Sequence, residues 1–163
     1  MHKQKLVVGT RSSQLALWQA DFVIGELAKK YPELVVEKRL MTTKGDKILN
    51  APLAKIGGKG LFTKELETAM LEGEIDIAVH SLKDMPMEVP EELPLLAFSK
   101  REDPRDVLVL PEGVSEIDKS KPLGCSSLRR TLQLKKLYPD MEVRSIRGNL
   151  QTRLRKLDEG QYS

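Results

Sequence analysis

The sequence predicts an α/β protein made of two lobes, each with a largely parallel β-sheet. Short apolar runs typical of strands alternate with segments of helical periodicity along the 163 residues. A charged segment at 100–105 interrupts this alternation, and the pattern then starts again. Both halves share one order: a Gly/Ser opening, a helix, a Tyr-Pro pair and a strand. We therefore predict a first lobe over 1–99, an interdomain crossing at 100–105 and a partial second lobe over 106–163, although such openings and stops are common enough for the repeat to be coincidental.

The first half begins with a strand, a long helix and a second strand. Residues 5–8 are an apolar run typical of a strand. Ser12 or Ser13 then caps a helical pattern in which apolar residues recur until Pro32 stops it. Residues 34–41 form the next strand-like run.

A polar, glycine-rich stretch over 42–60 predicts a long mobile loop. A second helix follows and is stopped by Gly73, and the compact apolar run at 75–79 predicts a strand. Two more apolar runs, at 95–98 and 107–110, predict strands on either side of the charged crossing.

The second half repeats the plan. Ser127 opens a helix that Pro139 stops, and residues 141–146 predict a strand. A last helix begins near Asn149, which can cap it, and Gly160 ends it. Parallel sheets bind ligands at the carboxyl ends of their strands, so we expect a site where these strands enter the following helices.

The composition narrows the class of protein. Apolar residues make up 40% and charged residues 31%, which is typical of a folded soluble chain. No apolar run approaches the roughly 18 residues that span a bilayer, and no secretory signal is visible, so we expect a cytoplasmic protein without a membrane partner. One cysteine and two histidines predict neither a disulfide nor a metal site. The segment 121–163 carries ten Lys/Arg against four Asp/Glu, net +6, yet its few aromatic residues argue against nucleic acid as a partner.

Cationic side chains gather where predicted strands give way to helices. Arg11 and Ser13 precede the first long helix, where free N–H groups suit a carboxylate or phosphate. Arg129 and Arg130 follow Ser127 in a first helical turn, where cations oppose the helix dipole unless an anion is bound. The alternative in each case is an ordinary N-cap beside solvated arginines.

Two further groups lie after predicted strands. Arg147 follows the 141–146 strand and Arg153 lies one turn into the next helix, which together predict a ligand with several carboxylates or phosphates. Lys83 and Asp84 follow the 75–79 strand, and Asp84 can act as general acid or base, or stabilise a cation in the substrate. The alternative is a polar turn with a local charge pair.

Several motifs occur together and in one order: GTRSSQLALWQ, GGKGLFTKELE, IDIAVHSLKDMP, SSLRR and IRGNLQTRLRKL. With these motifs the sequence resembles the porphobilinogen deaminases, also called hydroxymethylbilane synthases. The resemblance implies a type II periplasmic-binding-protein-like fold, with two lobes around a cleft and a third α/β domain beyond them. It also implies a transferase of haem and tetrapyrrole biosynthesis, which joins four porphobilinogen molecules into the linear tetrapyrrole hydroxymethylbilane and releases ammonia at each step.

The resemblance assigns roles to individual residues. Asp84 falls on the catalytic aspartate, which stabilises cationic azafulvene and pyrrole intermediates and moves protons. Lys55 and Lys59 fall on the mobile loop near the cleft. The remaining matched positions hold acetate and propionate groups of a dipyrromethane cofactor (Ser13, Lys83, Asp84, Ser127, Arg129 and Arg130) or of the substrate (Arg11, Ser13, Arg147 and Arg153).

The resemblance extends over an N-terminal portion only. Family members are considerably longer, so the resemblance leads us to expect an incomplete second lobe and no third domain in these 163 residues. We predict that they are inactive alone unless a second fragment completes them. The cysteine that carries dipyrromethane is expected in the missing C-terminal domain, and Cys125 is not that cysteine. The family implies a monomer. Two alternatives stay open: a non-enzymatic carboxylate- or anion-binding module of the same two-lobed fold, and a truncated product with only a folding or assembly role.

Overall fold

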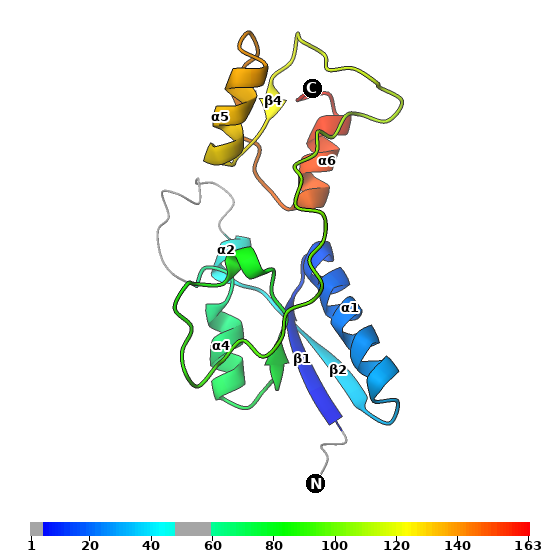
Figure 1. Cartoon of the computed structure of the whole chain (residues 1–163), viewed down its shortest axis with the longest axis vertical. Coiled ribbons are helices and arrows are strands. Elements are labelled where there is room, and N and C mark those ends of the chain that lie inside the picture. The colour runs from blue at the N-terminus through cyan, green and yellow to red at the C-terminus, as the bar shows by residue number, and fades with distance from the viewer. Residues whose placement is uncertain (1–4, 48–59) are drawn as a thin grey trace. The chain divides into compact units, whose positions relative to one another are not determined.

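The computed structural model describes residues 5–47 and 60–163. The chain divides into two compact units, Met1–Ser99 and Lys100–Ser163, and both are α/β with parallel strands (Figure 1). The α/β class with parallel sheets predicted from the sequence is therefore confirmed. The assignment of the two units as lobes of one binding fold stays a prediction. Within the described ranges, no helix has the length and apolar character that crossing a bilayer requires.

Strand β1 (Lys5–Arg11) is the centre of the first sheet. It pairs in parallel with β2 (Val35–Met41) on one side and with the short β3 (Ile77–Ala78) on the other. The β1–β2 register places Lys5 opposite Val35 and Arg11 opposite Met41, so the two strands end together. Their carboxyl ends therefore lie along one edge of the sheet.

Helices α1 (Gln14–Lys30) and α4 (Lys64–Leu71) cover opposite faces of this sheet. Leu66 is fully buried on α4 in a cluster that Val7 of β1 also contacts. Successive strand residues point to opposite faces, so Thr10 and Val7 point apart, and the Thr10 hydroxyl donates to the Ala16 carbonyl of α1 at 3.1 Å. This alternation fixes which face of β1 each helix covers.

The side chain of Ile75 packs so closely against the backbone of β1 that only glycine fits at position 9. A Cβ atom built on Gly9 would lie 2.3 Å from Cδ1 of Ile75, which is itself buried. Any larger residue at this position would push Ile75 away from its place in the core. Gly9 therefore belongs to the packing of the sheet, although the sequence alone suggested only the end of a strand.

Two short helices lie at the carboxyl edge of the first sheet and were not predicted. α2 (Lys44–Lys47) follows β2, and the 3₁₀ helix η1 (Leu82–Asp84) follows β3. The first falls inside the stretch 42–60 that the sequence predicts to be a loop. Residues 48–59, which include Lys55 and Lys59 of the predicted mobile loop, lie outside the described residues.

The second unit is smaller and follows the same plan. Strands β4 (Leu123–Gly124) and β5 (Val143–Arg144) pair in parallel, and helices α5 (Leu128–Leu137) and α6 (Leu150–Asp158) follow them. Ile146, Leu157 and Tyr162 form its buried cluster, and the Tyr162 hydroxyl donates to the Ser145 carbonyl at 3.1 Å. The predicted helices of this half are confirmed, and the predicted strand at 141–146 is reduced to two residues.

The predicted strands at 95–98 and 107–110 are wrong. Both segments are irregular, and their apolar side chains are largely exposed, with Leu96 at 77% and Val107 at 81%. Apolar, β-prone composition makes a strand only where a neighbouring strand accepts its backbone hydrogen bonds. Within the described residues neither sheet extends to these segments.

Candidate active site

The first unit brings one arginine and two aspartates to the carboxyl edge of its sheet. Arg11 is the last residue of β1, Asp46 lies in α2 after β2, and Asp84 ends η1 after β3. Three parallel strands that end at the same edge must deliver their following residues to one place, which is where such sheets bind ligands. Arg11 and Asp84, which the sequence places after two different strands, lie close together: Nη1 of Arg11 is 3.6 Å from Oδ2 of Asp84.

Arg11 is held on three sides. Its Nε donates to Oδ2 of Asp46 at 3.1 Å, and its Nη2 donates to the other oxygen of the same carboxylate. The guanidinium lies over the ring of Phe62, 4.2 Å from the ring centroid, in a cation–π contact. The side chains of Arg11, Asp46 and Asp84 are each only about one-fifth exposed. This edge of the sheet thus holds a largely buried guanidinium that is fixed by the carboxylate of Asp46 and lies beside the carboxylate of Asp84.

Ser13 and Lys83 lie on the elements that flank this arginine. Ser13 is the N-cap of α1, and its hydroxyl accepts from the Ala16 N–H at 3.3 Å, as the sequence predicts for one of its two candidate serines. Lys83 is exposed on η1, beside Asp84, and makes no ion pair with any residue in the described part of the chain.

His80 lies between β3 and η1, close to the same edge. Burial lowers the pKa of His80, and it outweighs the carboxylates of Asp84 and Glu67, which act in the opposite direction. The imidazole is therefore neutral near pH 7. The positive charge beside Asp84 then comes from Arg11 and Lys83 and not from this histidine.

In the second unit Ser127, Arg129 and Arg130 occupy the start of α5. Ser127 is the N-cap, and its hydroxyl accepts from the Arg130 N–H at 3.4 Å. Both guanidinium groups converge on Asp106: Nη1 of Arg129 lies 2.9 Å from Oδ2, and Nε of Arg130 lies 2.8 Å from Oδ1. The positive charge at this helix start is therefore balanced by a side chain of the same unit, the carboxylate of Asp106.

The hydrogen bonds from Arg129 and then Arg130 lower the pKa of Asp106 to about 2, well under its ordinary 3.8. Because the folded-state pKa is depressed, the pairing is complete above pH 3.8 and is lost as the pH falls through about 2. We expect the Asp106 carboxyl ¹³C resonance to titrate with a midpoint near 2, and Arg129→Gln to move that midpoint back towards 3.8. An unmoved midpoint in the variant would contradict the pairing.

Arg147 and Arg153 form a second cationic group, around the start of α6. Asn149 caps α6 by accepting from the Thr152 N–H at 2.9 Å, as predicted, and Nε of Arg153 donates to the Gly148 carbonyl at 2.9 Å. Burial, followed by the positive charge of Arg147, lowers the pKa of Arg153. Nε of Arg147 is buried and has no hydrogen-bond partner among the described residues.

The turn between these two arginines requires glycine. Gly148 has φ +120°, and a Cβ atom there would lie 2.5 Å from Cγ2 of Thr152. An L-residue would be strained in this backbone conformation and would also displace the capped first turn of α6. The sequence Arg-Gly-Asn thus positions the arginine, the turn and the cap as one unit.

The second-unit residues fit a ligand that carries several carboxylates. Nε of Arg147 has no hydrogen-bond partner among the described residues, and the positive charges of Arg147 and Arg153 repel each other, so a carboxylate that binds a guanidinium with both oxygens would suit this group. Residues that would hold such a group in this unit are Ser127, Arg129, Arg130, Arg147 and Arg153. Cys125 has a free thiol, which donates to the Ser127 carbonyl at 3.6 Å.

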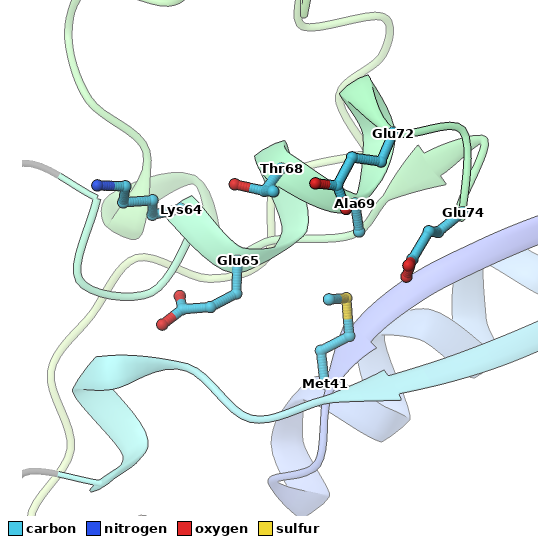
Figure 2. A pocket seen from close by; sticks show the side chains of 7 residues that line it. All are labelled: Met41, Lys64, Glu65, Thr68, Ala69, Glu72 and Glu74. Atoms are coloured by element: carbon cyan, nitrogen blue, oxygen red, sulfur yellow. The ribbon is translucent and has the colours of Figure 1, made fainter.

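The first unit also has a hollow that does not coincide with these residues (Figure 2). It has a volume of about 360 Å³, and Figure 2 shows its lining side chains on α4, on the loop that follows α4 and at the end of β2. Two of its glutamates are already engaged: Glu65 accepts from the Lys44 N–H at 2.8 Å and Glu74 pairs with Arg39 at 3.2 Å. Its acidic lining is opposite in charge to the predicted site, and none of the predicted site residues line it.

Sequence reasoning missed Asp46, Phe62 and Asp106. Asp46 had a readable signal, since Thr43 and Asp46 have the spacing of a helix N-cap and its N3 carboxylate. Phe62 gave no signal of this contact in the sequence, where it looks like part of the apolar pattern of the second helix; the structure places it just before α4. Asp106 gave no signal, because its partners lie 23 and 24 residues further along the chain.

Comparison with known proteins agrees with the predicted ligand chemistry. A family model described as "Porphobilinogen deaminase, dipyromethane cofactor binding domain" matches residues 6–163. The chain is similar to proteins named porphobilinogen deaminase from Acetivibrio thermocellus, at 57% identity over 98% of this chain and 54% of the relative, and from Chlorobium phaeobacteroides, at 52% identity over 98% and 52%. A third relative of that name, from Nitrosomonas europaea, is 54% identical over 98% of this chain and 53% of its own length.

The chain spans about half the length of these relatives. The matched family model covers both units and includes every residue of the candidate site described above. This match over nearly the whole chain and the identities above 50% show that the chain belongs to the porphobilinogen deaminase family.

Proposed function

We propose that the whole protein carrying this sequence is a hydroxymethylbilane synthase, a transferase that joins four porphobilinogen molecules and releases ammonia at each step. The observation that carries the proposal is the meeting of Arg11 and Asp84, with 3.6 Å between Nη1 and Oδ2, at the carboxyl edge of a parallel sheet. An arginine suited to a substrate carboxylate and a carboxylate suited to a substrate cation stand side by side there.

Asp84 is the proposed catalytic residue. When ammonia leaves the aminomethyl group of porphobilinogen, the carbon it leaves becomes electron-poor and positive charge spreads onto the pyrrole nitrogen. A carboxylate beside that nitrogen stabilises the charge. A new carbon–carbon bond to the next pyrrole leaves one proton too many on that ring, and the carboxylate can accept it.

The cationic residues bind and orient. Arg11, Ser13, Arg147 and Arg153 are proposed to hold substrate acetate and propionate groups, and Ser13, Lys83, Asp84, Ser127, Arg129 and Arg130 to hold dipyrromethane. Bound dipyrromethane supplies the primer on which the chain starts. Lys55 and Lys59, outside the described residues, are proposed to act from the loop near the cleft. Fixing several carboxylates at once aligns the reacting carbons and removes much of the entropic barrier.

We propose further that the two units are the lobes of a type II periplasmic-binding-protein-like fold, with a first lobe over 1–99, a crossing at 100–105 and a second lobe from 106. The α/β composition of both units and their shared strand–helix plan support this. We also propose a cytoplasmic monomer that uses neither nucleic acid nor a membrane as a partner.

The test is turnover by the whole natural protein. Incubated with porphobilinogen, it should release ammonia and form a linear tetrapyrrole, with four substrate molecules consumed per product. Saturable binding of porphobilinogen without ammonia release would overturn the proposal and would favour an anion-binding module with the same fold.

A further inference from the structure

We propose that Asp46 is a positioning residue: it fixes the guanidinium of Arg11 in the site and keeps it from closing onto Asp84. This inference rests on the proposed function for the roles of Arg11 and Asp84. Asp46 itself is not assigned to substrate. Its carboxylate, in α2 after β2, accepts hydrogen bonds from Arg11 and Thr43.

The Asp46 carboxylate is itself held firmly. Its Oδ2 accepts from the Thr43 N–H at 3.1 Å and from the Thr43 hydroxyl at 2.7 Å, and Thr43 is fully buried. Burial alone would raise the pKa of Asp46, yet the hydrogen bonds from Arg11 and Thr43 outweigh it and hold that pKa below its ordinary value. The group is therefore an anion in a fixed orientation.

Arg11 stands in unequal contact with two carboxylates. Asp46 takes both Nε and Nη2, in the two-pronged geometry that guanidinium and carboxylate prefer. Asp84 is left with a single approach of 3.6 Å, which is too long for a hydrogen bond. Arg11 therefore makes its hydrogen bonds to Asp46. The carboxylate of Asp84 lies near the same cation without forming a close ion pair with it.

The ring of Phe62 completes the arrangement. Its centroid lies 4.2 Å from the guanidinium carbon, so the ring helps to fix the plane of the group. Nη1 is the edge that faces Asp84. Nε and Nη2 of Arg11 are thus bound to Asp46, while Nη1 makes no hydrogen bond to any residue that the structure describes and could donate to a substrate carboxylate.

Asp46→Asn separates positioning from helix capping. An asparagine oxygen can still accept from the Thr43 N–H and keep the start of α2, but the amide cannot make the charged two-pronged pair with Arg11. In the whole natural protein we expect faster hydrogen exchange at Arg11 Nε, and a 10–100-fold lower kcat/KM for porphobilinogen, roughly the cost of losing a supporting partner. We expect Tm to change by no more than about 2 °C.

Two further variants sharpen the test. Asp21→Asn removes the partner of Lys38 in an exposed ion pair of the same unit and should leave both readouts unchanged. Asp46→Glu keeps the carboxylate and should restore slow exchange at Arg11 Nε in part. Thr43→Val removes the hydrogen bond from the Thr43 hydroxyl that orients Asp46. It should also speed exchange at Arg11 Nε and lower kcat/KM, by smaller factors than Asp46→Asn does. This variant gives a second test if Asp46→Asn does not fold.

The outcomes separate this inference from the proposed function. Unchanged exchange at Arg11 Nε in Asp46→Asn, or a loss of kcat/KM that Asp46→Glu does not relieve, would overturn the positioning role. A wild-type protein that shows no turnover would overturn the function, yet the exchange measurement would still test whether Asp46 fixes Arg11.

Discussion

Replacing Asp84 with asparagine should lower turnover of porphobilinogen by the whole protein about 10²–10⁴-fold, the usual contribution of a general acid–base group. Asparagine has the same shape, but it can neither balance a cation nor accept a proton at neutral pH. The arginines proposed to hold the substrate carboxylates are untouched, so porphobilinogen should still bind. Steady-state release of ammonia, together with a direct binding measurement, checks both halves of the expectation.

Glu72→Gln is the matched control for Asp84→Asn. It removes one carboxylate from the same unit, at the exposed end of α4, and should leave turnover unchanged. If Asp84→Asn turns over as fast as the control, the carboxylate has no chemical role and its 3.6 Å approach to Arg11 is only an ion pair. If it also stops binding, Asp84 acts on the shape of the site instead.

Leu66→Ala should destabilise the protein by about 2–5 kcal/mol, which is the range for deleting a fully buried leucine side chain. Leu66 has no exposed surface and packs with Ala69 and Ile75, the centre of the cluster between α4 and the sheet. The cavity cannot be filled easily, because Ile75 is already pressed against Gly9. Urea unfolding of the wild-type and variant proteins measures the difference in the free energy of unfolding.

Leu71→Ala is the control for this change, because it makes the same substitution on the same helix at a side chain that is 67% exposed. Its cost should stay within about 0.5 kcal/mol. Similar losses for Leu66 and Leu71 would mean that helix propensity, and not core packing, sets the stability of this unit.

Local pattern was enough to predict most of the helices and the parallel sheets. Helices α1, α5 and α6 begin at Ser13, Ser127 and Asn149, because each of these side chains accepts a hydrogen bond from the first helical turn. Each capping residue lies within four residues of the helical turn that it caps, so the helix start can be read from the local sequence. The class of ligand was predictable for the same reason, since arginines followed strand ends in the sequence itself.

Features that depend on distant partners were not predictable. The runs at 95–98 and 107–110 look like strands because composition reports β propensity and not the presence of a neighbour. Asp106 meets Arg129 and Arg130 only after the chain has folded, and Phe62 contacts Arg11 from 51 positions further along the chain, so neither contact can be read from the local sequence. The roles of the site residues stay predictions, and the structure adds the contacts and distances of those residues that it describes.

The pairing of Asp106 with two arginines has a consequence for how a ligand enters. If Arg129 and Arg130 bind a ligand carboxylate as proposed, that carboxylate must displace the carboxylate of Asp106. Asp106 belongs to the same chain and is therefore present at a high effective concentration. Entry is then an exchange of one anion for another, and the local charge hardly changes. Affinity at this position should therefore respond weakly to ionic strength, while discrimination falls to the shape of the ligand and to how many carboxylates it can present together.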